Sequence, residues 1–126
     1  MNPLSEKICC GTLGELLVQI RLFQYGVQAS PPIKDSGNDL IAIKGESFRA
    51  IQVKTRTQEP FGLGDLPARY HLLALVSLVG EDETLYLDAS RVFLVPKPVV
   101  ESRAIRTFAD VADFAMGREL VERLFA

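Results

Sequence analysis

The sequence contains no tryptophan, a single histidine and only two cysteines, which are adjacent. Neighbouring cysteines cannot readily bridge each other, and without spaced Cys and His residues the chain cannot build a zinc site of the usual structural kind. We interpret Cys9 and Cys10 as small core-filling residues in a reducing compartment and not as a redox centre.

Long apolar segments are also lacking. The longest, around HLLALVSLVG, is far shorter than the roughly 20 residues that a membrane helix needs, and the N-terminal stretch MNPLSEKICC contains no apolar signal region. The sequence therefore predicts a cytoplasmic protein with no membrane segment. With 126 residues, 48% of them hydrophobic and 24% charged, its composition is that of one globular domain over residues 1–126.

A helix is predicted over residues 6–25, with Ser5 as a suitable N-cap and Gly26 as a suitable stop. Apolar residues at three- and four-residue spacing form its expected buried stripe: Leu13, Leu16, Ile20 and Phe23. On another side of this helix, Glu15 and Gln19 lie one turn apart and point the same way.

The middle of the chain alternates apolar runs with turn-forming residues, which predicts a sheet. A short strand is expected at the start of GVQASPPIKDSGN, followed by a hairpin of DLIAIK and SFRAIQVKT through Gly45 and Glu46. After a mobile loop with a short helix near residues 66–70, LLALVSLV should pair with LYLDA, and RVFLVP should form a further short or edge strand. A terminal helix is expected over residues 107–125, with a break at Gly117.

Within this pattern, the stretch AIQVKT places Gln52 and Lys54 at alternate positions of a buried strand. Their side chains should share one face, and burying an ammonium group is costly unless it has a partner. Pairing Ile43 with Ser47 across the hairpin would place Asp39 opposite Ile51, next to Gln52.

A carboxylate, an amide oxygen and an ammonium group that converge at a strand end would suit Mg²⁺, which prefers oxygen ligands and retains several waters. Lys54 could then orient or deprotonate a water for attack on a phosphodiester, while the metal stabilises the charge that develops on the phosphate. The sequence thus indicates a site for phosphodiester hydrolysis.

The segments GELLVQIRL, SGNDLIAIKG and FRAIQVKTR resemble, in order and spacing, those of the PD-(D/E)XK nuclease superfamily. This superfamily includes Holliday-junction resolvases, restriction enzymes and one group of intron-encoded homing endonucleases. The resemblance implies an α/β fold with a restriction-endonuclease-like core, in which helices flank a mixed central β-sheet in the order α-β-β-β-α-β-β, with a C-terminal helix. It also implies DNA cleavage that depends on Mg²⁺ or Mn²⁺, metal ligands at Glu15, Asp39 and Gln52, and Lys54 as the catalytic lysine.

Two positions depart from the motif. Asn38 stands in place of the proline that precedes Asp39 in the motif, and that proline is not a metal ligand. Gln52 stands where most members carry Asp or Glu. An amide lowers the negative charge of the site and should weaken metal binding, although its oxygen can still coordinate. Besides an active endonuclease, the sequence therefore leaves open an inactive nuclease-like domain that serves as a DNA-binding or assembly module.

Partners are less directly indicated. The net charge of −2 does not mark a nucleic-acid-binding protein, but Arg49, Arg56 and Arg69 could follow a DNA backbone, with solvated surface charge as the alternative. His71 could contact phosphate or act as an acid, or be an ordinary structural residue.

Because cutting both strands needs two sites, we expect a homodimer or larger homo-oligomer. The apolar C-terminal helix either packs on its own sheet or joins an interface, and it is the only basis for a plain protein-interaction domain.

Overall fold

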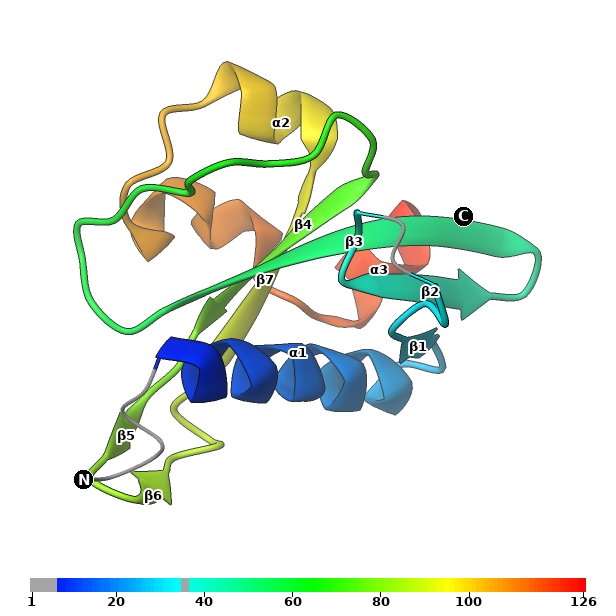
Figure 1. Cartoon of the computed structure of the whole chain (residues 1–126). Coiled ribbons are helices and arrows are strands. Elements are labelled where there is room, and N and C mark those ends of the chain that lie inside the picture. The colour runs from blue at the N-terminus through cyan, green and yellow to red at the C-terminus, as the bar shows by residue number, and fades with distance from the viewer. Residues whose placement is uncertain (1–6, 35–36) are drawn as a thin grey trace.

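A computed structural model describes residues 7–34 and 37–126 (Figure 1). The helices are α1 (Lys7–Gln24), α2 (Lys97–Ser102), the 3₁₀ helix η2 (Phe108–Phe114) and α3 (Arg118–Leu124). The strands are β1 (Gln28–Ser30), β2 (Leu40–Lys44), β3 (Ser47–Arg56), β4 (Leu72–Ser77), β5 (Gly80–Glu81), β6 (Thr84–Leu85) and β7 (Arg91–Pro96). The expected N-cap, Ser5, lies outside the described residues.

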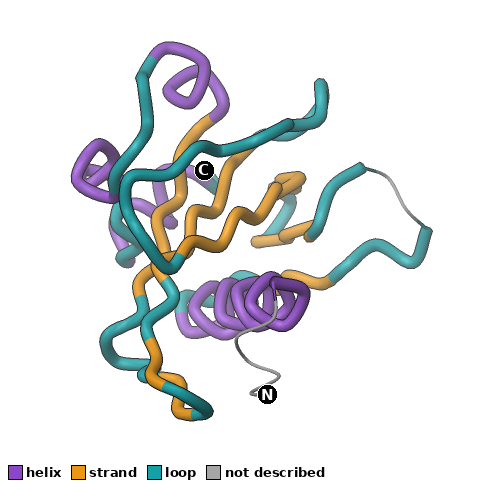
Figure 2. Tube along the Cα trace, turned by 60° about the vertical axis from the view of Figure 1, so that its left-hand side comes forward, coloured by secondary structure: helices purple, strands orange, loops and turns teal. Residues whose placement is uncertain are grey.

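The main sheet has the strand order β1-β2-β3-β4-β7. Strands β3 and β4 are parallel and the other pairs are antiparallel, so the sheet is mixed, as predicted. Strand β7 lies at an edge, also as predicted, and β5 and β6 form a separate small hairpin. Figures 1 and 2 show α1 along one side of the sheet, with α2 on the opposite side.

Each face of the sheet has its own apolar core. One contains residues of α1 and α3 packed on β2, β3, β4 and β7, including Leu17, Ile51 and Val121. The other contains residues of the long connection 57–71 and of η2, such as Phe61 and Phe108, packed on β4 and β7. Because side chains alternate along a strand, Ile51 and Val53 face α1, while Gln52 and Lys54 belong to the opposite face.

Helix α1 buries a different stripe from the one predicted. Its fully or nearly fully buried side chains are Leu17, Val18 and Leu22, whereas three members of the predicted stripe remain exposed: Leu16 (48%), Ile20 (54%) and Phe23 (70%). Two sides of this helix are apolar, so periodicity alone could not select the one that faces the sheet. The stop at Gly26 agrees with the prediction, since this residue has a φ of 80° and its N–H donates to the Phe23 carbonyl.

The β2–β3 hairpin is shifted by one residue from the predicted register. Lys44 pairs with Ser47 and Leu40 with Ile51, so the turn contains only Gly45 and Glu46. Gly45 has a φ of 61°, which glycine adopts readily in a two-residue turn. The paired register ends at Leu40, and continuing it by one residue would place Asp39 opposite Gln52.

The connection to β4 and the partner of β4 also differ from the predictions. Residues 57–71 form a loop without the short helix expected near residues 66–70. The partner of β4 in the hairpin is β7, whereas β6 pairs with β5. Buried Ser90 holds the turn before β7, since its hydroxyl donates to the Tyr86 carbonyl and accepts the Val79 N–H.

The C-terminal segment breaks at Gly117 as predicted, but its first part is the 3₁₀ helix η2. Leu120, Val121 and Phe125 are buried, so α3 packs on its own sheet. Helix α2 was not predicted: Pro96 precedes it and Pro98 lies in its first turn, where proline is tolerated. None of the helices in residues 7–34 and 37–126 is long and apolar enough to cross a membrane.

Candidate functional site

The candidate site lies where β2 and β3 separate. Strand β2 begins only at Leu40, while β3 runs on to Arg56, so in the described residues no strand pairs with residues 52–56 on that side. The Asp39 N–H still donates to the Ile51 carbonyl (3.2 Å), and its carboxylate Oδ2 then accepts the Val53 N–H at 2.8 Å. The Asp39 side chain thus replaces the backbone carbonyl that a longer β2 would have offered.

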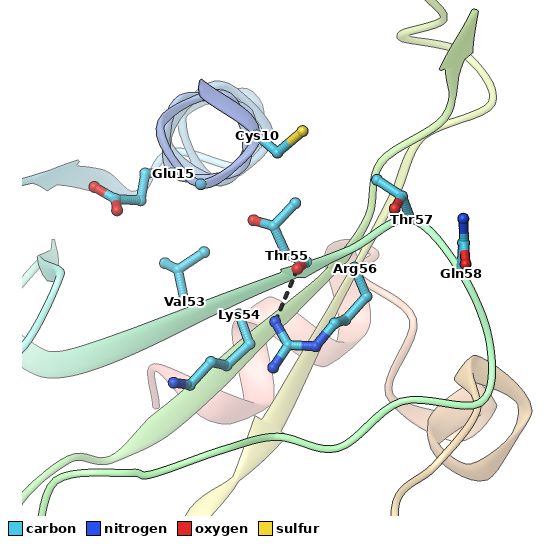
Figure 3. A pocket seen from close by; sticks show the side chains of 9 residues that line it. Cys10, Glu15, Val53, Lys54, Thr55, Arg56, Thr57 and Gln58 are labelled. Carbon is cyan, nitrogen blue, oxygen red and sulfur yellow. Dashed lines mark hydrogen bonds between the residues drawn. The ribbon is translucent and has the colours of Figure 1, made fainter. Parts of the chain in front are cut away.

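Glu15 approaches this edge from α1 (Figure 3). Burial raises the pKa of its carboxyl group above the usual value, and the negative charge of Asp39 raises it further. The structure therefore brings together the two predicted carboxylate ligands from different elements, close enough to repel each other. A cation between them would relieve this repulsion.

Gln52 and Lys54 occupy the other face of the same strand, as the alternation predicted. Gln52 is half-buried, and its Oε1 is a buried acceptor without a hydrogen-bond partner in the described part of the chain. The Lys54 Nζ donates to the Asp65 carbonyl at 3.0 Å, next to Gly64. In Figure 3, Val53 and Thr55 point towards α1, whereas the Lys54 side chain points away from it.

A cavity of about 610 Å³ opens beside this strand end. It is lined by Cys10, Gly11, Glu15, Val53, Lys54, Thr55, Arg56, Thr57 and Gln58. Glu15 and Lys54 therefore border one space although they belong to opposite faces of β3, because the missing neighbour strand leaves the edge open. Pockets that hold a small ligand are typically about 300–1,000 Å³, so the cavity could take a nucleotide unit in addition to an ion.

The donor set fits a hard divalent cation. No group of three His, Cys, Asp or Glu residues suited to a metal occurs among the described residues. The predicted set has two carboxylates and one amide, and the unpaired Gln52 Oε1 would have to supply the oxygen that an acidic residue supplies in most members of the superfamily. The Asp39 Oδ2 accepts the Val53 N–H, and the other carboxylate oxygen would be the one to bind a metal.

The predicted DNA-contacting residues have different surroundings. Arg49 donates to the carbonyls of Leu124 and Ala126, and Arg56 donates twice to the Gly62 carbonyl. The His71 Nδ1 accepts the Ala50 N–H at 2.8 Å, which ties the start of β4 to β3. Arg69 is exposed. For all four, contact with DNA stays a prediction.

Sequence reasoning missed the partners that hold the site residues in place. Asp65 supplies a backbone carbonyl to Lys54, so its residue type carries no signal. Gly64, with a φ of 65°, and the glycines of FGLGDLP could have indicated a backbone that passes close to a side chain.

The structure is similar to that of a bacterial homing endonuclease, I-Ssp6803I, with a TM-score of 0.58 over 79% of this chain and 71% of that chain. The chain has a restriction-endonuclease-like fold. The predicted fold class and the PD-(D/E)XK resemblance are therefore confirmed at the level of structure. Sequence identity with the homing endonuclease is 17%, so the likeness establishes the fold alone. No family model and no curated protein matches this chain.

Within this restriction-endonuclease-like fold, we expect Glu15→Gln to raise thermal stability. Ionised Glu15 is less favourable in the folded chain than in the unfolded one, so it destabilises the protein at a pH above its raised pKa. This cost disappears as the pH falls through the pKa of the folded state and below the pKa of the unfolded state. Calorimetry should show a Tm gain of about one to three degrees at pH 8 that vanishes near pH 4. Glu122→Gln, on an exposed position of α3, is the control. A stability loss at pH 8 in the Glu15 variant would contradict the assignment.

Proposed function

We propose that the protein is a DNA endonuclease that hydrolyses phosphodiester bonds with Mg²⁺ or Mn²⁺. Two observations support the proposal: the carboxylates of Glu15 and Asp39 lie near each other at the open edge of β3, and the Oε1 of Gln52, the residue before Val53, is a buried acceptor without a partner among the described residues. Lys54 lies one alternate position beyond Gln52 and borders the same cavity as Glu15. The restriction-endonuclease-like fold supports this reading.

Glu15, Asp39 and Gln52 would hold the metal through side-chain oxygens. When bound, a divalent ion supplies positive charge to the phosphate and lowers the pKa of a coordinated water. The Val53 N–H orients the Asp39 carboxylate, so that this ligand is already positioned before a metal arrives.

Lys54 would orient the attacking water or take its proton. Its ammonium group donates to a neutral carbonyl of the loop, that of Asp65. An ammonium group has three N–H donors, so two remain for water and for a phosphate oxygen.

Arg69 and His71, both exposed beside the start of β4, are the residues we assign to DNA backbone contacts first. Arg49 and Arg56 would reach a phosphate only by giving up hydrogen bonds to backbone carbonyls. We therefore expect them to contribute less.

The direct test is incubation of supercoiled, branched and linear DNA with the protein and Mg²⁺ or Mn²⁺. We expect cleavage products that disappear when EDTA removes the metal. DNA binding without cleavage would instead favour the inactive DNA-binding or assembly module. Neither binding nor cleavage on any of the three substrates would refute both.

The inactive module is favoured by two facts: Gln52 replaces an acidic ligand and the net charge is −2. Gln52→Glu separates the two functions, because it restores the charge without changing the length of the side chain. Cleavage by both proteins supports the active endonuclease. Cleavage that appears only in Gln52→Glu supports the inactive module.

We further propose that the protein is a homodimer or larger, since cutting both strands takes two sites. Leu16, Ile20 and Phe23 are exposed at positions i, i+4 and i+7 of α1, and this apolar stripe is the surface we assign to a second copy.

A charge placed in the apolar stripe should weaken that assembly. We expect Ile20→Glu to lower the mass measured by light scattering at micromolar concentration, because a desolvated carboxylate is unfavourable in an apolar contact. Gln24→Glu, on an exposed position of the same helix, should leave the mass unchanged. A monomeric wild-type protein would contradict the proposed oligomer.

A further inference from the structure

Gly14 of α1 lies against Thr55 of β3 with no room for a side chain. A Cβ at position 14 would come within 1.8 Å of the Thr55 Oγ1, 3.0 Å of its Cβ and 3.1 Å of its Cγ2. Real Cβ atoms do not make contacts as short as the first, so α1 can pack this closely on β3 only because residue 14 is glycine.

Gly11, one turn earlier on α1, offers an internal comparison. A Cβ at this position would meet nothing within 4 Å. Both glycines are unfavourable inside a helix, but only Gly14 has a packing reason to be there. The requirement is therefore local to the point where α1 meets Thr55.

The contact lies beside the candidate metal site. Glu15 follows Gly14 directly, so the separation of α1 from β3 sets how far its carboxylate reaches towards Asp39. On β3, Thr55 is two residues from Val53, whose N–H anchors Asp39. Figure 3 shows Val53 and Thr55 both pointing towards α1, with Glu15 above them. One stretch of β3 thus holds both the helix and the second carboxylate.

We propose that Gly14 and Thr55 form a positioning contact that sets the height of α1 above β3 and thereby places Glu15 to share a divalent cation with Asp39. The proposal rests on the proposed function for its metal and adds two positioning residues that touch neither the metal nor DNA. Thr55 acts through its shape, by limiting how closely α1 can approach β3.

The steric role agrees with the surroundings of Thr55. Its Oγ1 is buried and has no hydrogen-bond partner in the described part of the chain. Replacing an unpaired buried hydroxyl by a methyl group of the same shape is expected to be neutral or stabilising. We therefore expect Thr55→Val alone to retain metal affinity and to unfold at the same or a higher temperature.

The test uses Gly14→Ala, Gly11→Ala, and the double variants Gly14→Ala/Thr55→Ala and Gly14→Ala/Thr55→Val. Mn²⁺ affinity is measured by calorimetry, DNA cleavage is assayed in parallel, and the Cα separation of residues 14 and 55 is taken from crystal structures. We expect Gly14→Ala to weaken Mn²⁺ binding by about 10- to 100-fold, as loss of a supporting contact does at other metal sites. Gly11→Ala should bind Mn²⁺ like the wild type.

The double variants distinguish a positioning contact from a merely structural one. Thr55→Ala removes Oγ1 and Cγ2 and leaves only the 3.0 Å contact with the Thr55 Cβ, so it should restore most of the binding to Gly14→Ala, whereas Thr55→Val preserves the obstruction and should not. Unchanged Mn²⁺ affinity in folded Gly14→Ala overturns the proposal, as does equal recovery by the two double variants. If Gly14→Ala alone does not fold, restored folding and Mn²⁺ binding in the Thr55→Ala double variant alone supports the proposal.

A wild-type protein that binds no Mn²⁺ would refute the proposed function separately. The crystal structures then decide the positioning contact. A Cα separation of residues 14 and 55 that widens in Gly14→Ala and recovers with Thr55→Ala supports it, and an unchanged separation overturns it.

Discussion

Lys54→Ala should reduce metal-dependent DNA cleavage by about 10²- to 10⁴-fold, the range expected when a positioned proton-transfer group is lost. The Lys54 ammonium lies on the same strand face as Gln52, and it borders the cavity that Glu15 also borders. Its removal leaves the attacking water unoriented and the phosphate without that charge. The measurement is the single-turnover cleavage rate at saturating Mg²⁺.

A matched control is Lys44→Ala, which removes a partly exposed lysine at the turn end of β2. It should cleave DNA at the wild-type rate. Both variants should retain Mn²⁺ affinity, because neither lysine supplies an oxygen ligand. Cleavage by Lys54→Ala at the wild-type rate would remove this residue from the mechanism.

Asp39→Asn should weaken Mn²⁺ binding by about tenfold or more while leaving the fold nearly as stable, because one ligand charge is lost and the hydrogen-bond acceptor is kept. The amide oxygen can still accept the Val53 N–H. Asp39→Ala loses both functions and should in addition reduce the free energy of unfolding by about 1–2 kcal/mol, since the Val53 donor is left unpaired. Calorimetry and urea unfolding measure the two effects separately.

Asp65→Asn is the control for this pair. Asp65 contributes its backbone carbonyl to Lys54, so changing its side chain should affect neither Mn²⁺ binding nor stability. A folded Asp39→Asn protein with wild-type Mn²⁺ affinity would show that the metal, if bound, is held elsewhere.

The strand positions of the proposed site residues could be predicted because they depend on local rules. Alternation along β3 places Gln52 and Lys54 on one face whatever the rest of the chain does, and a tight hairpin brings Asp39 to them within a residue of the true register. The one-residue error came from the turn, where Gly45 at positive φ allows a two-residue connection instead of a three-residue one.

Features that depend on packing between distant segments could not be predicted in this way. Helix α1 is apolar on two sides, and the side that meets the sheet is the one that carries Leu17, Val18 and Leu22, which the periodicity did not single out. Two apolar runs, residues 85–89 and β7, could each have paired with β4. The bonds of buried Ser90 make a compact turn before β7, and they involve a residue type with no strong turn signal.

The two carboxylates of the site have opposite effects on the stability of the fold. Asp39 completes the hydrogen bonding of a strand edge, so folding alone is a reason to keep it. Glu15 is held where burial and a neighbouring charge oppose its ionisation, so folding alone is a reason to discard it. In a lineage released from the need to cut DNA, mutation would replace Glu15 sooner than Asp39. Under the proposed function, a bound cation would offset the cost of ionised Glu15, so the two carboxylates would be kept for different reasons.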